Sequence, residues 1–197
     1  MCAKNVKQKF NDKSMMSIKE KYNKEVISEM KKQFGFTNDF QVPKIDKVIV
    51  NVGIGKFIKD SALVKDVFNS LKAITGQKPV MTKSKKSIAG FKTREGLEIG
   101  IKITLRGKRK WQFLDKLVGA AIPRVRDFHG LKVSAVDQKG NLNIGIKEHL
   151  IFPEISPEQV KTTFGLQVNV TTNAKSHAEG LALFRALGFP IEKKEVK

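Results

Sequence analysis

The chain has 197 residues, a formal net charge of +19 and a pI near 10.0, which favours a polyanionic partner such as nucleic acid, an anionic membrane or an acidic protein. An apolar share of 40% excludes wholesale disorder, and the length fits one domain with a sizeable core. The single cysteine, Cys2, excludes an internal disulfide and a cysteine-based zinc site, and without an apolar leader or membrane-spanning run the sequence predicts a cytoplasmic protein.

The N-terminal region divides into a tail and a helix. Residues 1–13 carry four lysines and one aspartate without periodicity, which predicts a flexible basic tail. The sequence SIKE is a capping box, in which Ser17 accepts from a backbone amide and Glu20 reaches back. A helix is therefore expected to start there and to end at Gly35. Its apolar stripe recurs at every fourth position: Ile18, Tyr22, Val26, Met30 and Phe34.

A strand and a second helix come next. KVIVNV, over 47–52, alternates between valines on one face and Lys47, Ile49 and Asn51 on the other, which predicts a strand with one buried face. The following helix is expected to open near Asp60 or Ser61 and to end at Gly76. Its stripe consists of Leu63, Val67, Leu71 and Ile74.

The stretch GQKPVMTKSKKSIAGFKTR, over 76–94, contains six basic residues and no acidic one, and it predicts a long basic loop. The clearest alternation in the chain follows over 97–106, where Leu and Ile at every odd position are interrupted by polar, basic or glycine residues. One face of this strand is expected to pack, and the other to stay polar and open.

The remaining elements complete an α+β pattern. A helix is expected from about Lys110 to just before Pro123, two short strands over 131–136 and 141–146 around a turn at Gly140, and another strand over 166–171. A capping box at Ser176 opens the last helix, which Gly188 ends. Alternating strands favour a mostly antiparallel sheet with helices packed on one face and an open polar face, extended by the long basic loop.

Positive charge is concentrated in the middle of the chain. From Gly76 to Phe113, eleven Lys and Arg stand against two Glu, and five of the six arginines fall between Arg94 and Arg126. A guanidinium binds phosphate in a bidentate manner and stacks on bases, so this pattern favours nucleic acid over a merely solvated basic face. Phe91 lies among these lysines, and two interpretations stay equally open: stacking on a base or ribose, or fastening the loop to its own domain.

Signals for other chemistry are weak. Gly53-Ile54-Gly55 lacks the third glycine of a dinucleotide fingerprint, the three histidines have no metal-ligand spacing, and no G-x-S-x-G occurs. Arg124 and Arg126 beside Asp127 fit a structural ion pair at least as well as an RNA contact. The sequence thus predicts no enzyme and no cofactor, and leaves a general electrostatic nucleic-acid binder as the second hypothesis and membrane-surface binding as a weaker one.

Five motifs occur in an order that resembles one family. VPKIDKVIVNVGIG, ITGQKPVMTKSKKSIAGFKTREG, ITLRGKRKWQFLDKL, AIPRVRDFHGL and GIKEHLIFPEI together resemble the bacterial-type ribosomal protein L5 family of the large subunit, from about Ser17 to Pro190. The segment VSAVDQKGNLN departs from the family's usual hairpin pattern. The sequence therefore predicts one RNA-binding domain over 14–190, between a basic tail over 1–13 and a charged tail over 191–197, and at these two ends the chain departs from the family pattern.

The resemblance also implies a function and partners. It implies binding to 5S rRNA and its attachment to 23S rRNA in the central protuberance, beside the large-subunit protein L18, with a loop that reaches peptidyl-site tRNA and a bridge to the small-subunit protein S13. The 5S rRNA site would comprise Asn51, Gln77, Lys78, Lys102, Thr104 and Arg106. The tRNA-contacting loop would comprise Thr82, Lys83, Lys85, Lys86, Ser87, Phe91 and Lys92.

Overall fold

The computed structural model describes residues 16–192 except 59, 92, 157, 159 and 161, and these form an α+β fold around one antiparallel sheet, as the sequence predicts. The five strands lie in the order β2-β3-β1-β5-β4, and every pair is antiparallel. Their bounds are β1 Ile45–Gly53, β2 Val80–Lys83, β3 Glu98–Leu105, β4 Leu142–Ile146 and β5 Leu166–Thr172. The longest strand, β1, therefore lies at the centre.

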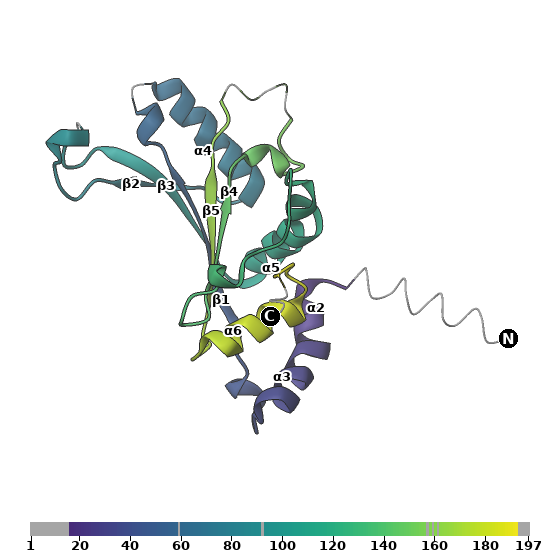
Figure 1. Cartoon of the computed structure of the whole chain (residues 1–197). Coiled ribbons are helices and arrows are strands. Elements are labelled where there is room, and N and C mark those ends of the chain that lie inside the picture. The colour runs from purple at the N-terminus through teal and green to yellow at the C-terminus, as the bar shows by residue number, and fades with distance from the viewer. Residues whose placement is uncertain are drawn as a thin grey trace.

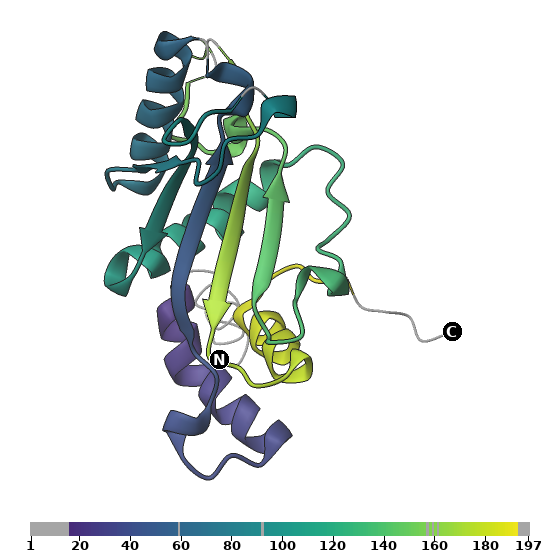
Figure 2. The same ribbon diagram turned by 90° about the vertical axis from the view of Figure 1, so that its left-hand side faces the viewer.

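One face of the sheet carries the hydrophobic core. Val50 pairs with Ile103 of β3 and with Val168 of β5, and all three side chains are almost completely buried. Because side chains alternate along a strand, the residues between them point to the opposite face. Figure 2 looks onto that opposite face, where β1, β5 and β4 run without a helix in front of them and α5 lies behind the sheet.

The first helix begins and ends where the sequence predicts. Its parts are α2 Ile18–Lys21, a π-helical turn Tyr22–Val26 and α3 Ile27–Phe34. The Ser17 hydroxyl accepts from the amide of Glu20, and Gly35 closes the helix with a left-handed φ of 69°. The Ile18 amide donates to Asp115 at 2.7 Å, which anchors this helix to α5.

Three further helices complete the packing. They are α4 Ser61–Thr75, α5 Gly107–Lys116 and α6 His177–Leu187, and α5 continues through a π-helical turn, Leu117–Ala121, and a 3-10 turn, Ile122–Arg124. Helix α5 begins at Gly107, three residues before the expected Lys110 and shortly after the end of β3. Figure 1 shows α2, α3 and α6 together at one end of the sheet and α4 at the other.

The contact between α6 and the turn before β4 requires two glycines. A Cβ on Gly180 would collide with the backbone of Gly140, whose carbonyl oxygen would lie 2.7 Å away. Gly140 itself has a left-handed φ of 71°, and its carbonyl accepts from the Thr172 hydroxyl at 2.7 Å. The last helix can therefore approach the sheet only because neither residue has a side chain.

The strand predicted over 131–136 is wrong. Leu131 forms a parallel bridge with Ile191, whereas Val136 forms an antiparallel bridge with Leu142. Because the two ends pair with different segments, the chain between them turns through a short 3-10 helix, Val133–Ala135. The expected hairpin before β4 is thus reduced to one bridge and the turn at Gly140, where Asp137 accepts from the amides of Lys139 and Asn141.

The chain ends fall largely outside the described residues. The predicted tail over 1–13 lies wholly outside them, as does 193–197 of the predicted C-terminal tail. Ile191 is buried, and Glu192 donates its amide to the carbonyl of Leu131 at 2.9 Å. In the described part of the chain, no helix combines the length and the apolar character that crossing a membrane requires.

Candidate nucleic-acid interface

The open face of the sheet consists of the side chains that point away from the core. Register places Lys102 beside Asn51 and Asn51 beside Gln167 in one row, and Thr104, Ile49 and Asn169 in the next row. Asn51, Lys102 and Gln167 are exposed, whereas Thr104 and Asn169 are half-buried. The open face, as used below, comprises Lys47, Ile49, Asn51, Lys102, Thr104, Asn143, Gln167, Asn169 and Thr171.

Asn51 and Lys102, both predicted from the sequence, lie directly opposite each other on neighbouring strands. Arg106 follows β3 and lies 4.0 Å from Asp46, but both side chains are more than half exposed, so this ion pair is weak. The face therefore offers an amide and exposed cations in one plane. Such a surface suits the hydroxyls, base edges and phosphates of an RNA groove.

Gln77 and Thr104 also come together, through the main chain of β3. The Gln77 side-chain amide donates to the Thr104 carbonyl at 3.2 Å, and its oxygen accepts from Arg109 at 3.4 Å. Gln77, which precedes β2, thus bonds to β3 through its side chain rather than its backbone. This bond holds the Gln77 side chain at the edge of the sheet. Lys78, the next residue, is exposed.

Three amide side chains of the open face were not among the predicted site residues. Gln167 and Asn169 lie on β5, and Asn143 lies on β4, where its side-chain oxygen accepts from the Asn169 amide. The alternation in LQVNVT and NLNIGI contains the signal that identifies them. Together they extend the polar face across the strands beyond β1.

The predicted basic loop is an ordered hairpin, because β2 pairs with β3 and further bonds continue the pairing outward. Ser84 donates its amide to Leu97 at 2.8 Å and accepts from Gly96, and Ile88 and Thr93 exchange both backbone bonds. Figure 1 shows this hairpin projecting from the body of the molecule. A short 3-10 turn, Ala89–Phe91, forms its tip.

The predicted loop residues occupy different parts of this hairpin. Thr82 lies on β2 over the sheet, since a Cβ on Gly100 would meet its hydroxyl at 2.7 Å. Phe91 at the tip is 78% exposed, so it does not fasten the hairpin to the domain. Of the predicted loop residues, Lys83, Lys85, Lys86 and Ser87 are also exposed, whereas Lys92 lies outside the described residues.

Lys110, one of the basic residues between Gly76 and Phe113, has a structural role. The Lys110 ammonium donates to the carbonyls of Ile45 and Asp46, where the register of β1 shifts. It also lies 5.2 Å from the ring centre of its neighbour Trp111. Burial lowers the pKa of Lys110, opposed by the charge of Asp46, and two of its three N–H donors are already used within the fold.

Other candidate sites do not come together. In the described ranges, Asp127 forms no ion pair with Arg124 or Arg126, and no three His, Cys, Asp or Glu side chains gather as metal ligands. The His149 ring is buried and stacks on Phe164 with ring centres 3.9 Å apart. The backbone amide of Phe164 donates to its Nδ1 at 3.4 Å, and burial lowers the pKa of His149.

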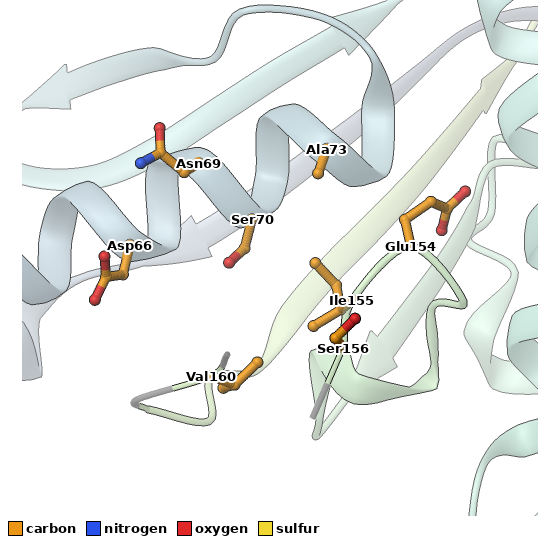
Figure 3. Close-up of a pocket in the computed structure, with 8 residues that line it drawn as sticks. All are labelled: Asp66, Asn69, Ser70, Ala73, Glu154, Ile155, Ser156 and Val160. Atoms are coloured by element: carbon orange, nitrogen blue, oxygen red, sulfur yellow. The ribbon is translucent and has the colours of Figure 1, made fainter. Parts of the chain in front are cut away.

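A hollow of about 270 Å³ lies between α4 and the segment 154–160 (Figure 3). Its charged residues are Asp66 and Glu154, and Glu154 accepts from the Lys116 ammonium at 2.6 Å. None of the described lining residues is basic, so this hollow offers no cation that would bind phosphate. The other lining residues are Asn69, Ser70, Ala73, Ile155, Ser156 and Val160.

An antiparallel sheet with an open polar face, exposed cations and a projecting basic hairpin defines a protein of the structural RNA-binding class. The family model "Ribosomal protein L5" matches residues 38–94, and the model for the C-terminus of the ribosomal L5 family matches residues 98–191. Between them, the two models span the five strands and the helices α4, α5 and α6, whereas α2 and α3 precede the matched residues.

Whole-length relatives agree with the family models. The chain is 46% identical over 180 residues to "Large ribosomal subunit protein uL5" of Colwellia psychrerythraea strain 34H, a match that covers 91% of this chain and 99% of the relative. It is 45% identical over 179 residues to the protein of the same name from Shewanella sp. strain ANA-3, covering 91% and 100%. The chain belongs to the bacterial ribosomal protein L5 family.

Family membership fixes the broad role. The chain is a structural, non-enzymatic and RNA-binding component of the large subunit of the cytoplasmic ribosome. This assignment confirms the prediction that the chain is not an enzyme, and it replaces the weaker hypothesis of membrane-surface binding.

Proposed function

We propose that the open face binds 5S rRNA and helps to attach it to 23S rRNA in the central protuberance. The observation that carries this proposal is the open face itself: exposed Asn51 and Lys102 lie side by side, and the row continues to Gln167. The resemblance assigns 5S rRNA contact to Asn51, Gln77, Lys78, Lys102, Thr104 and Arg106, all of which lie on or beside this face.

The chemistry of the face suits a shaped RNA. An RNA helix displays 2′-hydroxyls and base edges across a wide, shallow minor groove, and its major groove is too narrow for side chains. Amide and hydroxyl groups can donate and accept there, while lysines and arginines neutralise the flanking phosphates. Affinity then comes mainly from counterion release, and specificity from shape together with a few polar contacts.

The hairpin would serve a different partner. Its exposed Lys83, Lys85 and Lys86 and the aromatic tip at Phe91 project from the body, which supports contact with peptidyl-site tRNA. The resemblance adds L18 and S13 as protein neighbours without assigning residues to them. The hairpin thus extends the reach of the protein, whereas the open face holds it in place.

The test is a binding titration of the full chain with 5S rRNA across a salt series, with a duplex RNA and a duplex DNA of equal length as competitors. Selective 5S rRNA binding that persists at moderate salt supports the proposal. Equal affinity for all three nucleic acids, with one steep salt slope, supports the general electrostatic binder instead.

A single variant probes the face itself. Thr104→Ala is expected to weaken 5S rRNA binding with little loss of stability, because the Thr104 hydroxyl makes no hydrogen bond inside the described fold that would need replacing. Thr104→Ser, which keeps the hydroxyl, is the matched control. Normal binding by Thr104→Ala would exclude Thr104 from the RNA site.

A further inference from the structure

Phe40 is the most exposed large apolar side chain in the described part of the chain, with 94% of its surface accessible. It precedes β1 and belongs to neither the open face nor the hairpin. Single exposed apolar residues are common on protein surfaces, so exposure alone carries no function. The way in which Phe40 is held is more informative.

The backbone around Phe40 is fixed on both sides. Phe40 lies in a 3-10 turn, Asp39–Gln41, which Val42 closes by donating its amide to the Asp39 carbonyl at 3.3 Å. The Gln41 side-chain oxygen accepts from the Thr37 amide at 3.3 Å. Val42 is buried in the core, and the Asp39 carboxylate pairs with Lys31. The ring is therefore presented outward from an ordered turn, not from a slack loop.

The surroundings of this turn are positively charged. The acidic residues nearest to the turn in sequence are Asp39, which pairs with Lys31, and Asp46, which lies 4.0 Å from Arg106. Lys32 and Lys44 are exposed and form no ion pair within the described ranges. Figure 2 shows the segment that leads into β1 at the lower end of the open face. Phe40 is thus an exposed aromatic ring that has lysines around it and lies at the end of an RNA-binding face. Such a ring suits stacking on a nucleobase better than insertion into an apolar pocket of a protein.

We propose that Phe40 is a stacking platform for one unpaired base of the RNA that occupies the open face. An unpaired base has a free π face, whereas a base within a helix is already covered on both sides. The hydrogen-bonded turn lowers the entropic cost of this contact, because the backbone that carries the ring does not have to be ordered on binding. The inference rests on the proposed function and adds to it a single-stranded contact beyond the residues already assigned.

The experiment measures 5S rRNA affinity across a salt series for the wild type, Phe40→Ala, Phe40→Leu and Phe40→Tyr, with Lys44→Ala as the neighbouring control. Stacking is not an ion contact, so Phe40→Ala is expected to weaken binding roughly tenfold at every salt concentration with an unchanged slope. Phe40→Tyr keeps the platform and should bind as the wild type does, and Phe40→Leu should resemble Phe40→Ala. Lys44→Ala removes an exposed cation beside the open face and is therefore expected to flatten the slope by about one, unlike the Phe40 variants.

A spectroscopic readout identifies the contact directly. Phe40→Trp is expected to show quenching by RNA beyond that of the native Trp111, which is half-buried. Wild-type affinity of Phe40→Ala, or of Phe40→Leu, would overturn the inference, and so would unchanged fluorescence at position 40 in a saturated complex. These outcomes are distinct from failure of the proposed function, in which the wild type itself would not prefer 5S rRNA to a duplex.

Discussion

The open face and the hairpin are both basic, yet they are built differently. Residues of the open face lie on four strands, and their positions are fixed by the core on the other side: Val50, behind the face, is 1% exposed. Beyond Lys83, the hydrogen bonds of the described hairpin residues join the hairpin only to itself, and its tip residue Phe91 is 78% exposed. We therefore propose two tasks for these similarly charged regions: recognition of a fixed RNA shape by the open face, and contact with a more distant partner by the hairpin.

The largest expected effect is on the stability of the packing that supports the open face, where α6 lies against the turn before β4. Gly180→Ala places a methyl group against the Gly140 backbone and is expected to lower the free energy of unfolding by about 2 kcal/mol. Thermal unfolding should show a decrease in Tm of roughly 4 to 8 °C. Gly119→Ala is the control, because a Cβ there meets nothing within 4 Å. Equal Tm values for the two variants would contradict the close packing of α6 on the turn.

The next effect compares one lysine from each region. Lys102→Ala is expected to lower 5S rRNA affinity by roughly tenfold near 0.1 M salt and to flatten the salt slope by about one. Lys85→Ala in the hairpin should leave both quantities unchanged, although both lysines are exposed. Equal losses from the two variants would remove the distinction between the face and the hairpin.

A smaller effect concerns pH and the body of the protein. Burial places the folded-state pKa of His149 below its ordinary value of 6.5, although the charge of Glu148 opposes this shift. As pH falls through 6.5, the unfolded chain takes up this proton before the folded chain does, so the free energy of unfolding decreases.

Denaturant titrations between about pH 7 and pH 5.5 isolate this effect, because most carboxylates stay charged in that range. His149→Gln is expected to show a shallower dependence of stability on pH than the wild type. Parallel curves for the two proteins would show that His149 titrates alike in the folded and unfolded chains.

The smallest expected effect is on stability at the hairpin tip. Phe91→Ala should change the free energy of unfolding by less than about 0.5 kcal/mol, because its side chain is mostly exposed already. Binding to 5S rRNA should also be unchanged, whereas contact with peptidyl-site tRNA in assembled ribosomes should weaken. A clear loss of stability would restore the interpretation in which Phe91 fastens the hairpin to the domain.

The strands were predictable where local alternation coincides with the buried face. The alternation over 47–52 and 97–106 indicated both strands, the open face and the positions of Asn51, Lys102 and Thr104 within it. The segment 131–136 also looked like a strand, but its two ends pair with Ile191 and Leu142. Such long-range pairing leaves no local pattern in the sequence.

Other features depended on contacts that the sequence does not display. The strand β2 was not predicted, because the lysines and the proline around it are typical of a loop. Val80 and Met81 nevertheless pair with β3. Lys110 looked like one more RNA-binding cation, but its ammonium is used at the shifted register of β1. The exposure of Phe40 follows from the turn that holds it, which no periodicity indicates.

Lysine-modification footprinting, read by mass spectrometry with and without 5S rRNA, tests the division of roles most directly. Lys102 and Lys85 are both exposed in the free protein, so each should react when RNA is absent. With 5S rRNA bound, Lys102 and Lys78 are expected to be protected, while Lys85 and Lys86 stay reactive. Protection of Lys85 and Lys86 while Lys102 remains reactive would show that the hairpin binds 5S rRNA and that the open face does not.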